Sequence, residues 1–213
     1  KDYNQWPNNK KFQQTMIDFF EKASDVADAT LNLIFKSIKT NSLHSPIGDK
    51  RTSTVRLNYY PVDDPLNLKE QDNTLALGDM ALHHHTDPGI LTLLLQDMSG
   101  GLQTYSKESG WIDIPPEKDT IVVNLGDAMQ VWTNDKYVAA VHRVTSRVSS
   151  TRYSTPYFFN PSNDSVIQPL QTLPKSKPKF RPFTWKEYIR GRVNDNYSDI
   201  GDEDIQIDRF RLK

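Results

Sequence analysis

Between residues 90 and 160, short apolar runs follow one another at roughly ten-residue spacing. The runs are rich in Val, Ile, Leu, Thr and Tyr, and Gly, Asn-Asp or Pro-Pro separates neighbouring runs. Parallel strands need a long crossover between them, so this pattern predicts an antiparallel sandwich or barrel. The runs that we expect to form strands are STVRLNYY upstream, then ILTLLLQ, LQTYS, WIDI, TIVVNLG, QVWT, VAAVHRVT and RYSTPYFF.

The first forty residues follow a different period. From Phe12 to Ile38 apolar side chains recur every three to five residues, which predicts one long amphipathic helix. Its apolar stripe is expected to face the core and contains Phe12, Met16, Phe19, Ala23, Val26, Leu31, Ile34 and Ile38.

The composition suits a single domain, because 213 residues that are 36% hydrophobic and 25% charged can bury one sizeable core. We expect an N-terminal helix at about 8–40, a β core at about 53–160 and a C-terminal extension at about 161–213. In the extension, Thr184 is expected to cap a short helix. The basic tract KSKPKFR is interpreted as a solvated linker rather than a binding patch, and the acidic tail NDNYSDIGDEDIQ as mobile.

Charge and cysteine content restrict the partners. A formal net charge of −1 with scattered Lys and Arg gives no clustered basic excess, and no apolar run approaches the ~20 residues of a membrane span. We therefore expect no nucleic-acid or membrane partner. We also expect a monomeric, cytoplasmic protein. The absence of cysteine excludes disulfides and thiolate ligands, so nitrogen and oxygen must hold any metal.

Three of the five histidines lie in one heptapeptide, HHHTDPG, at residues 83–89. Residues i and i+2 of an extended segment point to the same face, so His85 and Asp87 can present an imidazole and a carboxylate to one point. His83 would lie on the same face only if the strand were straight from residue 83 to residue 87. The Pro-Gly pair that follows Asp87 ends the extended segment. A single His-x-Asp also fits a capped turn or a satisfied polar cluster, and the tripled histidine also fits an exposed polar run.

A stable metal site needs a third ligand from elsewhere, and only His44 and His142 remain. His44 lies in a polar turn, SLHSP, whereas His142 lies in the strand-like VAAVHRVT, which other strands can hold rigidly. Two histidines and one carboxylate on one side of a metal form the facial triad of non-haem Fe(II) oxygenases.

A second cluster follows ten residues beyond His142, in Arg152-Tyr153-Ser154. On a strand Arg152 and Ser154 face the same way, and Pro156 and Phe158 continue that row. A guanidinium fork beside a hydroxyl fits a carboxylate, and a buried arginine needs such an anionic partner. An internal pair with Asp or Glu is the other reading of this motif.

Together these segments resemble a known family. The stretch from Arg56 to Pro161 is similar to the Fe(II)- and 2-oxoglutarate-dependent oxygenases of the isopenicillin N synthase-like group. Four motifs occur in the same order and spacing over about half of the chain, which is far more specific than any one of them. RLNYYP resembles the family's N-x-Y segment, HTDPGILTLLLQD its H-x-D segment, GGLQ and VVNLGDAMQVWTND its central strands, and VHRV and RYSTPYFF its distal histidine and R-x-S.

The resemblance implies a mainly β fold with flanking α-helices, in which a double-stranded β-helix, or jelly-roll, carries the long helix on its outside. It implies that His85, Asp87 and His142 are the iron ligands, which selects His85 from the three consecutive histidines. The family also has a long segment before the position of Lys1 that helps to close the substrate pocket, and we expect this chain to lack it.

The cosubstrate site follows from the same resemblance. Arg152 and Ser154 match the pair that holds the distal carboxylate of 2-oxoglutarate, with Tyr60 and Asn58 as further hydrogen-bond partners. Pocket-wall positions near the metal match Thr92, Leu94 and Phe158.

The implied activity is oxidation of a C–H bond of a small molecule by O2, with Fe(II) as cofactor and 2-oxoglutarate as cosubstrate. Hydroxylation, desaturation and ring closure remain open, and by family habit the substrate belongs to specialised metabolism. Two alternatives remain: an Fe(II) oxidase that uses no 2-oxoglutarate, with Arg152 and Ser154 holding the substrate's own carboxylate, and a non-catalytic jelly-roll protein that binds a metal such as Zn(II).

Overall fold

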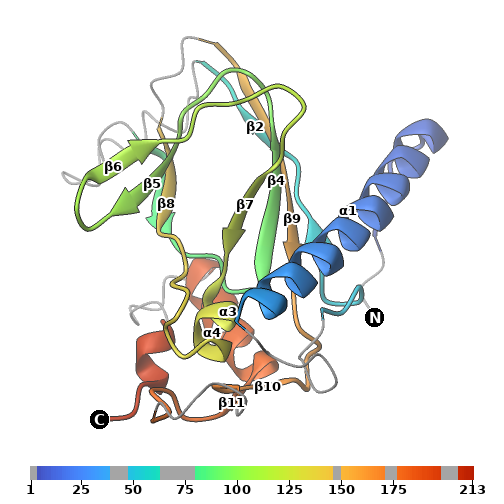
Figure 1. Ribbon diagram of the computed structural model, residues 1–213. Coiled ribbons are helices and arrows are strands. Elements are labelled where there is room, and N and C mark those ends of the chain that lie inside the picture. Colours follow the sequence, from blue (N-terminus) through green and yellow to red (C-terminus); the bar gives the residue numbers. More distant parts are fainter. Residues whose placement is uncertain (1–3, 39–47, 63–79, 146–149, 171–176, 198–205) are drawn as a thin grey trace.

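The computed structural model describes residues 4–38, 48–62, 80–145, 150–170, 177–197 and 206–213, and the side chains of 80–83 and 193–197 lie outside this description. Two antiparallel sheets face each other, as Figure 1 shows. Apart from the neighbouring pairs β1–β2 and β5–β6, successive strands alternate between them, which makes the core a double-stranded β-helix. The predicted antiparallel fold and jelly-roll are therefore confirmed.

The major sheet has the strand order β1-β9-β4-β7, with β2 also paired to β9. Its strand β9 is the longest and is buried on both faces over its second half, because the cavity lies on one side and a helix on the other. The members of this sheet are β1 (Thr54–Val55), β2 (Asn58–Tyr60), β4 (Leu91–Gln96), β7 (Val122–Leu125) and β9 (Arg152–Phe159).

The minor sheet has the order β3-β8-β5-β6. The β5–β6 hairpin closes at Gly110, whose φ of 69° lies in the left-handed region that glycine adopts without strain. The members are β3 (Met80–His85), β5 (Leu102–Ser106), β6 (Gly110–Asp113) and β8 (His142–Thr145).

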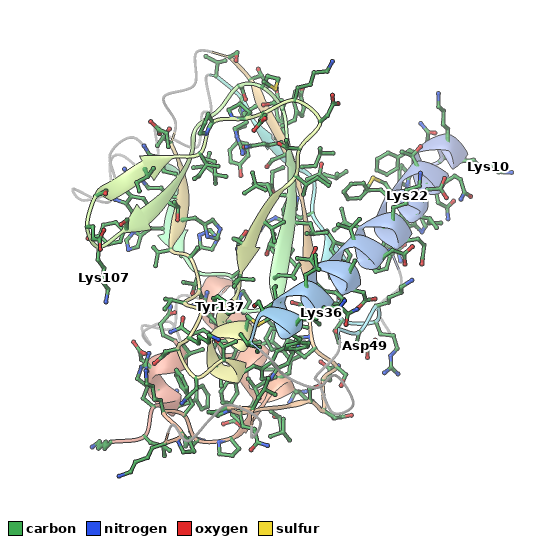
Figure 2. The ribbon with its side chains drawn as sticks, viewed as in Figure 1. Lys10, Lys22, Lys36, Asp49, Lys107 and Tyr137 are labelled. Carbon is green, nitrogen blue, oxygen red and sulfur yellow. The ribbon has the colours of Figure 1, made fainter. Side chains whose placement is uncertain are left out.

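Helix α1 (Lys10–Ser37) crosses the outer face of the major sheet, with the end at Lys36 near the sheet and the end at Lys10 projecting beyond it (Figure 2). The Asn9 side chain caps its first turn by accepting a hydrogen bond from the Phe12 amide at 3.0 Å. The Ser24 hydroxyl also meets the Tyr157 hydroxyl of β9 at 2.8 Å, which fixes the helix on the sheet.

The long helix predicted over residues 12–38 is confirmed, but its stripe was partly misplaced. The buried positions follow a four-residue step through Ala23, Ala27, Leu31 and Phe35. Val26, which was expected in the stripe, is 45% exposed because it lies one residue, and hence about 100° of helix rotation, away from this row.

The region predicted as the strand QVWT is instead the last part of a helix, α3 (Asp127–Trp132). All six of its residues are buried. The sequence therefore shows no alternation of apolar and polar positions that would distinguish a helix from a strand.

The C-terminal elements pack below the two sheets, near α3 (Figure 1). The Thr184 hydroxyl accepts the Glu187 amide at 3.2 Å and caps α4, as predicted. None of the helices in the described part of the chain combines the length and apolar character needed to cross a membrane. These elements are β10 (Val166–Ile167), β11 (Phe183–Thr184), α4 (Trp185–Tyr197) and the 3-10 helix η2 (Ile207–Phe210).

Among the described residues of the basic tract, Lys177, Pro178, Lys179 and Arg181 are exposed, as expected for a solvated linker, but Phe180 is not. Phe180 is buried, and its backbone pairs with that of Arg211. Lys179 and Arg211 both form ion pairs with Asp135, at 3.1 and 2.7 Å. Burial by itself raises the pKa of Asp135, but these ion pairs outweigh it and lower the pKa to about 2. Residues 198–205 of the acidic tail lie outside the described chain.

Replacing Phe35 by alanine should lower the free energy of unfolding by about 3–5 kcal/mol, because the ring is only 3% exposed and belongs to the hydrophobic core. Leu33→Ala, on the same helix but 66% exposed, should change it by less than about 0.5 kcal/mol. Denaturant titration of both variants measures this difference, and equal losses would contradict the observed packing of α1.

Candidate metal and cosubstrate site

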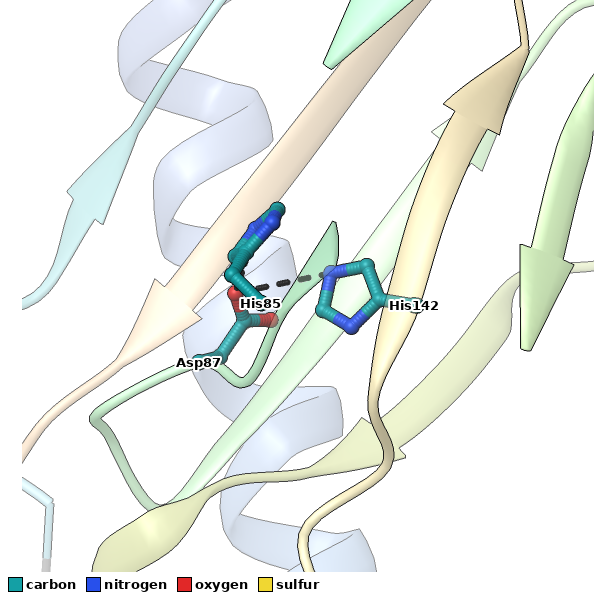
Figure 3. A group of neighbouring side chains, drawn as sticks. All are labelled: His85, Asp87 and His142. Atoms are coloured by element: carbon teal, nitrogen blue, oxygen red, sulfur yellow. Dashed lines mark ion pairs between the residues drawn. The ribbon is translucent and has the colours of Figure 1, made fainter. Parts of the chain in front are cut away.

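Three side chains converge where the minor sheet opens toward the major sheet. His85 ends β3, Asp87 follows in the next loop, and His142 begins β8 directly opposite His85 in the strand register. One ligand atom from each lies within 4.8 Å of the other two. Figure 3 shows the two imidazole rings and the carboxylate pointing toward one another.

The donor set fits a divalent transition metal. The Asp87 Oδ1 atom lies 3.6 Å from Nε2 of His85 and 3.6 Å from Nε2 of His142, so two nitrogens and one oxygen surround a common point. This is the two-histidine, one-carboxylate composition of the facial triad. The sequence prediction that His142 joins His85 and Asp87 agrees with this geometry.

The other oxygen of Asp87 is fully engaged by the major sheet. Its Oδ2 atom accepts hydrogen bonds from the Thr92 hydroxyl at 2.5 Å and from the Asn124 amide at 2.9 Å. These bonds fix the carboxylate plane and leave Oδ1 facing the histidines. Thr92 was predicted only as pocket wall, and Asn124 was not predicted, because no spacing in the sequence links it to Asp87.

The tautomer of His142 is also set by a neighbour. Its Nδ1 lies 2.9 Å from the Ala140 carbonyl oxygen, which can only accept a hydrogen bond. Nδ1 therefore carries the proton, and the Nε2 lone pair is directed at the common point, as a metal ligand requires.

The loop that carries Asp87 is held from behind by α3 and α4. The Asp127 amide donates to the Asp87 carbonyl at 2.8 Å, and the Arg192 guanidinium of α4 donates to the Thr86 carbonyl at 2.8 Å. The Tyr188 hydroxyl donates to the Asp127 carboxylate at 2.6 Å, while burial raises the pKa of Asp127.

Gly126, the residue just before α3, has no room for a side chain. A Cβ there would overlap the carbonyl oxygens of Gly89 and Asp87. Close backbone approach between β7 and the metal-ligand loop therefore requires glycine at this position.

Arg152 forms the second half of the site and is 1% exposed. Its guanidinium donates to the Gly100 carbonyl at 2.9 Å, to Ser154 Oγ at 3.1 Å and to Gln96 Oε1 at 3.2 Å. Gly100 presents that carbonyl from a left-handed backbone with φ of 83°. Burial lowers the pKa of Arg152, and the nearby Tyr60 opposes this shift.

Within the described part of the chain no carboxylate lies within ion-pair distance of Arg152, and Asp97 attracts the guanidinium only from further away. The reading of this motif as an internal acid–base pair is therefore not supported. Ser154 Oγ accepts from both Arg152 and the Asn58 amide, at 3.1 and 3.3 Å, which leaves its own proton for an incoming acceptor. The Tyr60 ring lies 5.0 Å from the Arg152 guanidinium. An anion that enters here would meet a guanidinium and a hydroxyl together.

Both halves open into one cavity of about 750 Å³. Its lining contains every residue that the sequence assigned to the metal, cosubstrate or pocket wall, including Leu94 and Phe158. His84 is exposed beside Trp111, with ring centroids 6.2 Å apart. His44 and the His83 side chain lie outside the described residues.

Comparison with known proteins identifies the family. Residues 51–161 match the model of the 2OG-Fe(II) oxygenase superfamily, so the chain belongs to this superfamily, as predicted. It is 33% identical to the 2-oxoglutarate-Fe(II) type oxidoreductase hxnY of Emericella nidulans, over 91% of this chain and 56% of that protein. It is also 33% identical to 1-aminocyclopropane-1-carboxylate oxidase 4 of Solanum lycopersicum, over 85% of this chain and 56% of the relative.

Among solved structures, a full-length Neurospora crassa protein in complex with alpha-KG superposes with a TM-score of 0.79 at 29% identity. The match covers 91% of this chain and 61% of that one. The chain thus spans about half the length of the relatives that it matches.

Asn124→Ala should weaken Fe(II) binding about 10- to 100-fold, because it removes one of the two hydrogen bonds that orient Asp87. Val123→Ala, the adjacent and 44% exposed position of the same strand, is the matched control. Anaerobic Fe(II) titration of both variants provides the comparison. Equal affinity in the wild type and Asn124→Ala would contradict an orienting role for this amide.

Proposed function

We propose that the protein is an Fe(II)- and 2-oxoglutarate-dependent oxygenase that oxidises a C–H bond of a small molecule. His85, Asp87 and His142 would hold Fe(II). Arg152 and Ser154 would hold the distal carboxylate of 2-oxoglutarate, with Tyr60 and Asn58 beside them.

One observation supports this proposal: the buried Arg152 guanidinium, with no described carboxylate within ion-pair distance, lines the same cavity as His85, Asp87 and His142. A buried unpaired charge is costly, so an anion that binds there gains both the ion pair and the hydrogen bonds. A dicarboxylate that reaches from Arg152 toward the metal satisfies both halves of the site.

Bound Fe(II) would supply the redox chemistry by which O2, 2-oxoglutarate and a substrate C–H bond give CO2, succinate and an oxidised product. The residues of the chain position the reactants for this reaction. Thr92 and Asn124 keep Asp87 oriented, and the Ala140 carbonyl keeps His142 in its ligand tautomer. Apolar cavity walls from Leu94, Leu102, Ile114, Val122 and Phe158 limit water at the reacting centre.

The nature of the substrate is a further part of the proposal. Structural neighbours include the same Neurospora crassa protein in complex with alpha-KG and thymine, and JOX2 in complex with 2OG, Fe and JA. These small ligands, and a cavity of about 750 Å³, support a small-molecule substrate, which we place in specialised metabolism.

A second candidate is an oxidase that uses no 2-oxoglutarate, in which Arg152 and Ser154 hold the substrate's own carboxylate. The Ser154 hydroxyl can donate its hydrogen, and the Arg152 guanidinium can donate beside it, to a carboxylate of any molecule. This observation supports the second candidate. Anaerobic addition of 2-oxoglutarate to the Fe(II)-loaded protein separates the two, because its chelation gives a visible charge-transfer band without substrate.

Fe(II), O2 and 2-oxoglutarate together should yield succinate with the wild-type protein, and His85→Ala or Asp87→Ala should abolish this turnover, because each removes one of three metal ligands. His84→Ala, on the exposed neighbouring position, should retain it. Succinate is measured after incubation with and without Fe(II). Retained decarboxylation in both ligand variants would overturn the iron assignment, and a wild-type protein that binds Zn(II) but forms no succinate would favour a non-catalytic role.

Arg152→Gln should raise the KM for 2-oxoglutarate by about 10- to 100-fold, since a charge-assisted pair to the distal carboxylate is lost. The KM for 2-oxopentanoate, which lacks that carboxylate, should change far less. Steady-state decarboxylation of both 2-oxoacids tests the assignment. A similar rise for the two compounds would show that Arg152 does not contact the distal carboxylate.

A further inference from the structure

The edge of the major sheet carries a second arginine that the proposed reaction does not use. Strands β1 and β2 pair with β9 in one continuous register, from Thr54 opposite Phe158 to Tyr60 opposite Arg152. Arg56 therefore stands opposite Pro156, and its amide donates to the Pro156 carbonyl at 3.0 Å. Proline has no amide proton to return, which explains why the ladder is interrupted here without a change of register.

This register fixes the face on which Arg56 lies. Directly opposed residues of an antiparallel pair project to the same side of the sheet, and Pro156 lines the cavity. Arg56 shares that side with Asn58 and Tyr60 by the two-residue alternation of a strand, and it too lines the cavity. Unlike the buried Arg152, it is exposed and therefore lies at the cavity mouth.

Arg56 has no counterion in the described chain. Its guanidinium makes no hydrogen bond or ion pair with another described residue, in contrast to Arg51, which is paired with Asp49 at 2.7 Å. Its charge is therefore available to a ligand that fills the mouth of the cavity.

The charges of the cavity favour an anionic ligand at this position. Its described lining contains two guanidinium groups, one carboxylate and two imidazoles. With the imidazoles neutral, as metal ligands are, the two guanidinium groups and one carboxylate leave one positive charge. A divalent cation and the dianion 2-oxoglutarate together add no net charge, so this surplus remains when both are bound. A monoanionic substrate would neutralise that surplus as it displaces water from the mouth.

We propose that Arg56 binds the carboxylate of the substrate, and that the substrates are small monocarboxylic acids. The inference rests on the proposed oxygenase function and deepens it by naming the substrate class. With about 4.8 Å between strands and 3.3 Å per residue, the Cα atom of Arg56 lies about 12 Å from that of Thr92, which contacts Asp87. A bound acid thus has its carboxylate at the mouth and its apolar part near the metal.

Binding of matched ligands to the anaerobic Fe(II)- and 2-oxoglutarate-loaded protein tests this assignment. The probes are octanoate, cinnamate and 3-phenylpropanoate, each beside its primary amide, and calorimetry measures the dissociation constants. At least one acid should bind the wild-type protein more tightly than its amide, by about fivefold or more. Arg56→Gln should remove this preference, and Arg56→Lys should restore part of it because the charge returns.

Arg51→Gln is the matched control, because its side chain is 85% exposed and lies outside the cavity lining. It should keep the wild-type preference for the acid. A wild-type protein that decarboxylates 2-oxoglutarate but binds no acid more tightly than its amide would overturn the role of Arg56 alone. A preference that survives Arg56→Gln would do the same. Failure to bind or decarboxylate 2-oxoglutarate at all would instead overturn the proposed function.

Discussion

The pairing of β3 with β8 is the constraint on which the geometry of the candidate metal site depends. It places His85 opposite His142, two residues that are distant in the chain. The ladder is irregular between Met80 and Leu82 and again between Leu82 and His85, so β3 reaches this register through bulges. Bulges commonly re-aim a side chain beside a functional site. A slip of one residue would turn His142 to the other face and separate the imidazoles.

The two sheets divide the work of the site between them. The minor sheet supplies both imidazoles, whereas the major sheet supplies the hydrogen bonds to Asp87 and the guanidinium and hydroxyl of Arg152 and Ser154. The chain crosses repeatedly from one sheet to the other, so residues of the two sides of the site alternate along the sequence. The cavity therefore exists only when the whole jelly-roll is assembled.

The sequence carried the parts of this architecture that depend on period and spacing. The two-residue alternation of β9 identified Arg152 and Ser154 as one row, and the spacing of short strands identified the sheet class. Contacts set by tertiary packing had no such signal. No motif or spacing in the sequence predicts that Asn124 binds Asp87, or that Arg192 binds the carbonyl of Thr86. The helix at Asp127–Trp132 was missed because complete burial erases the difference between the periods of helix and strand.

The loop carrying Asp87 is braced by groups that never touch the metal position, namely the Asp127 amide and the guanidinium of Arg192 in α4. Hydrogen bonds from α3 and from α4 thus hold the loop within the protein itself. In zinc fingers, by contrast, the ion creates its own binding geometry as the peptide folds around it. The position of Asp87 therefore depends on two helices that contribute no ligand atom to the candidate site.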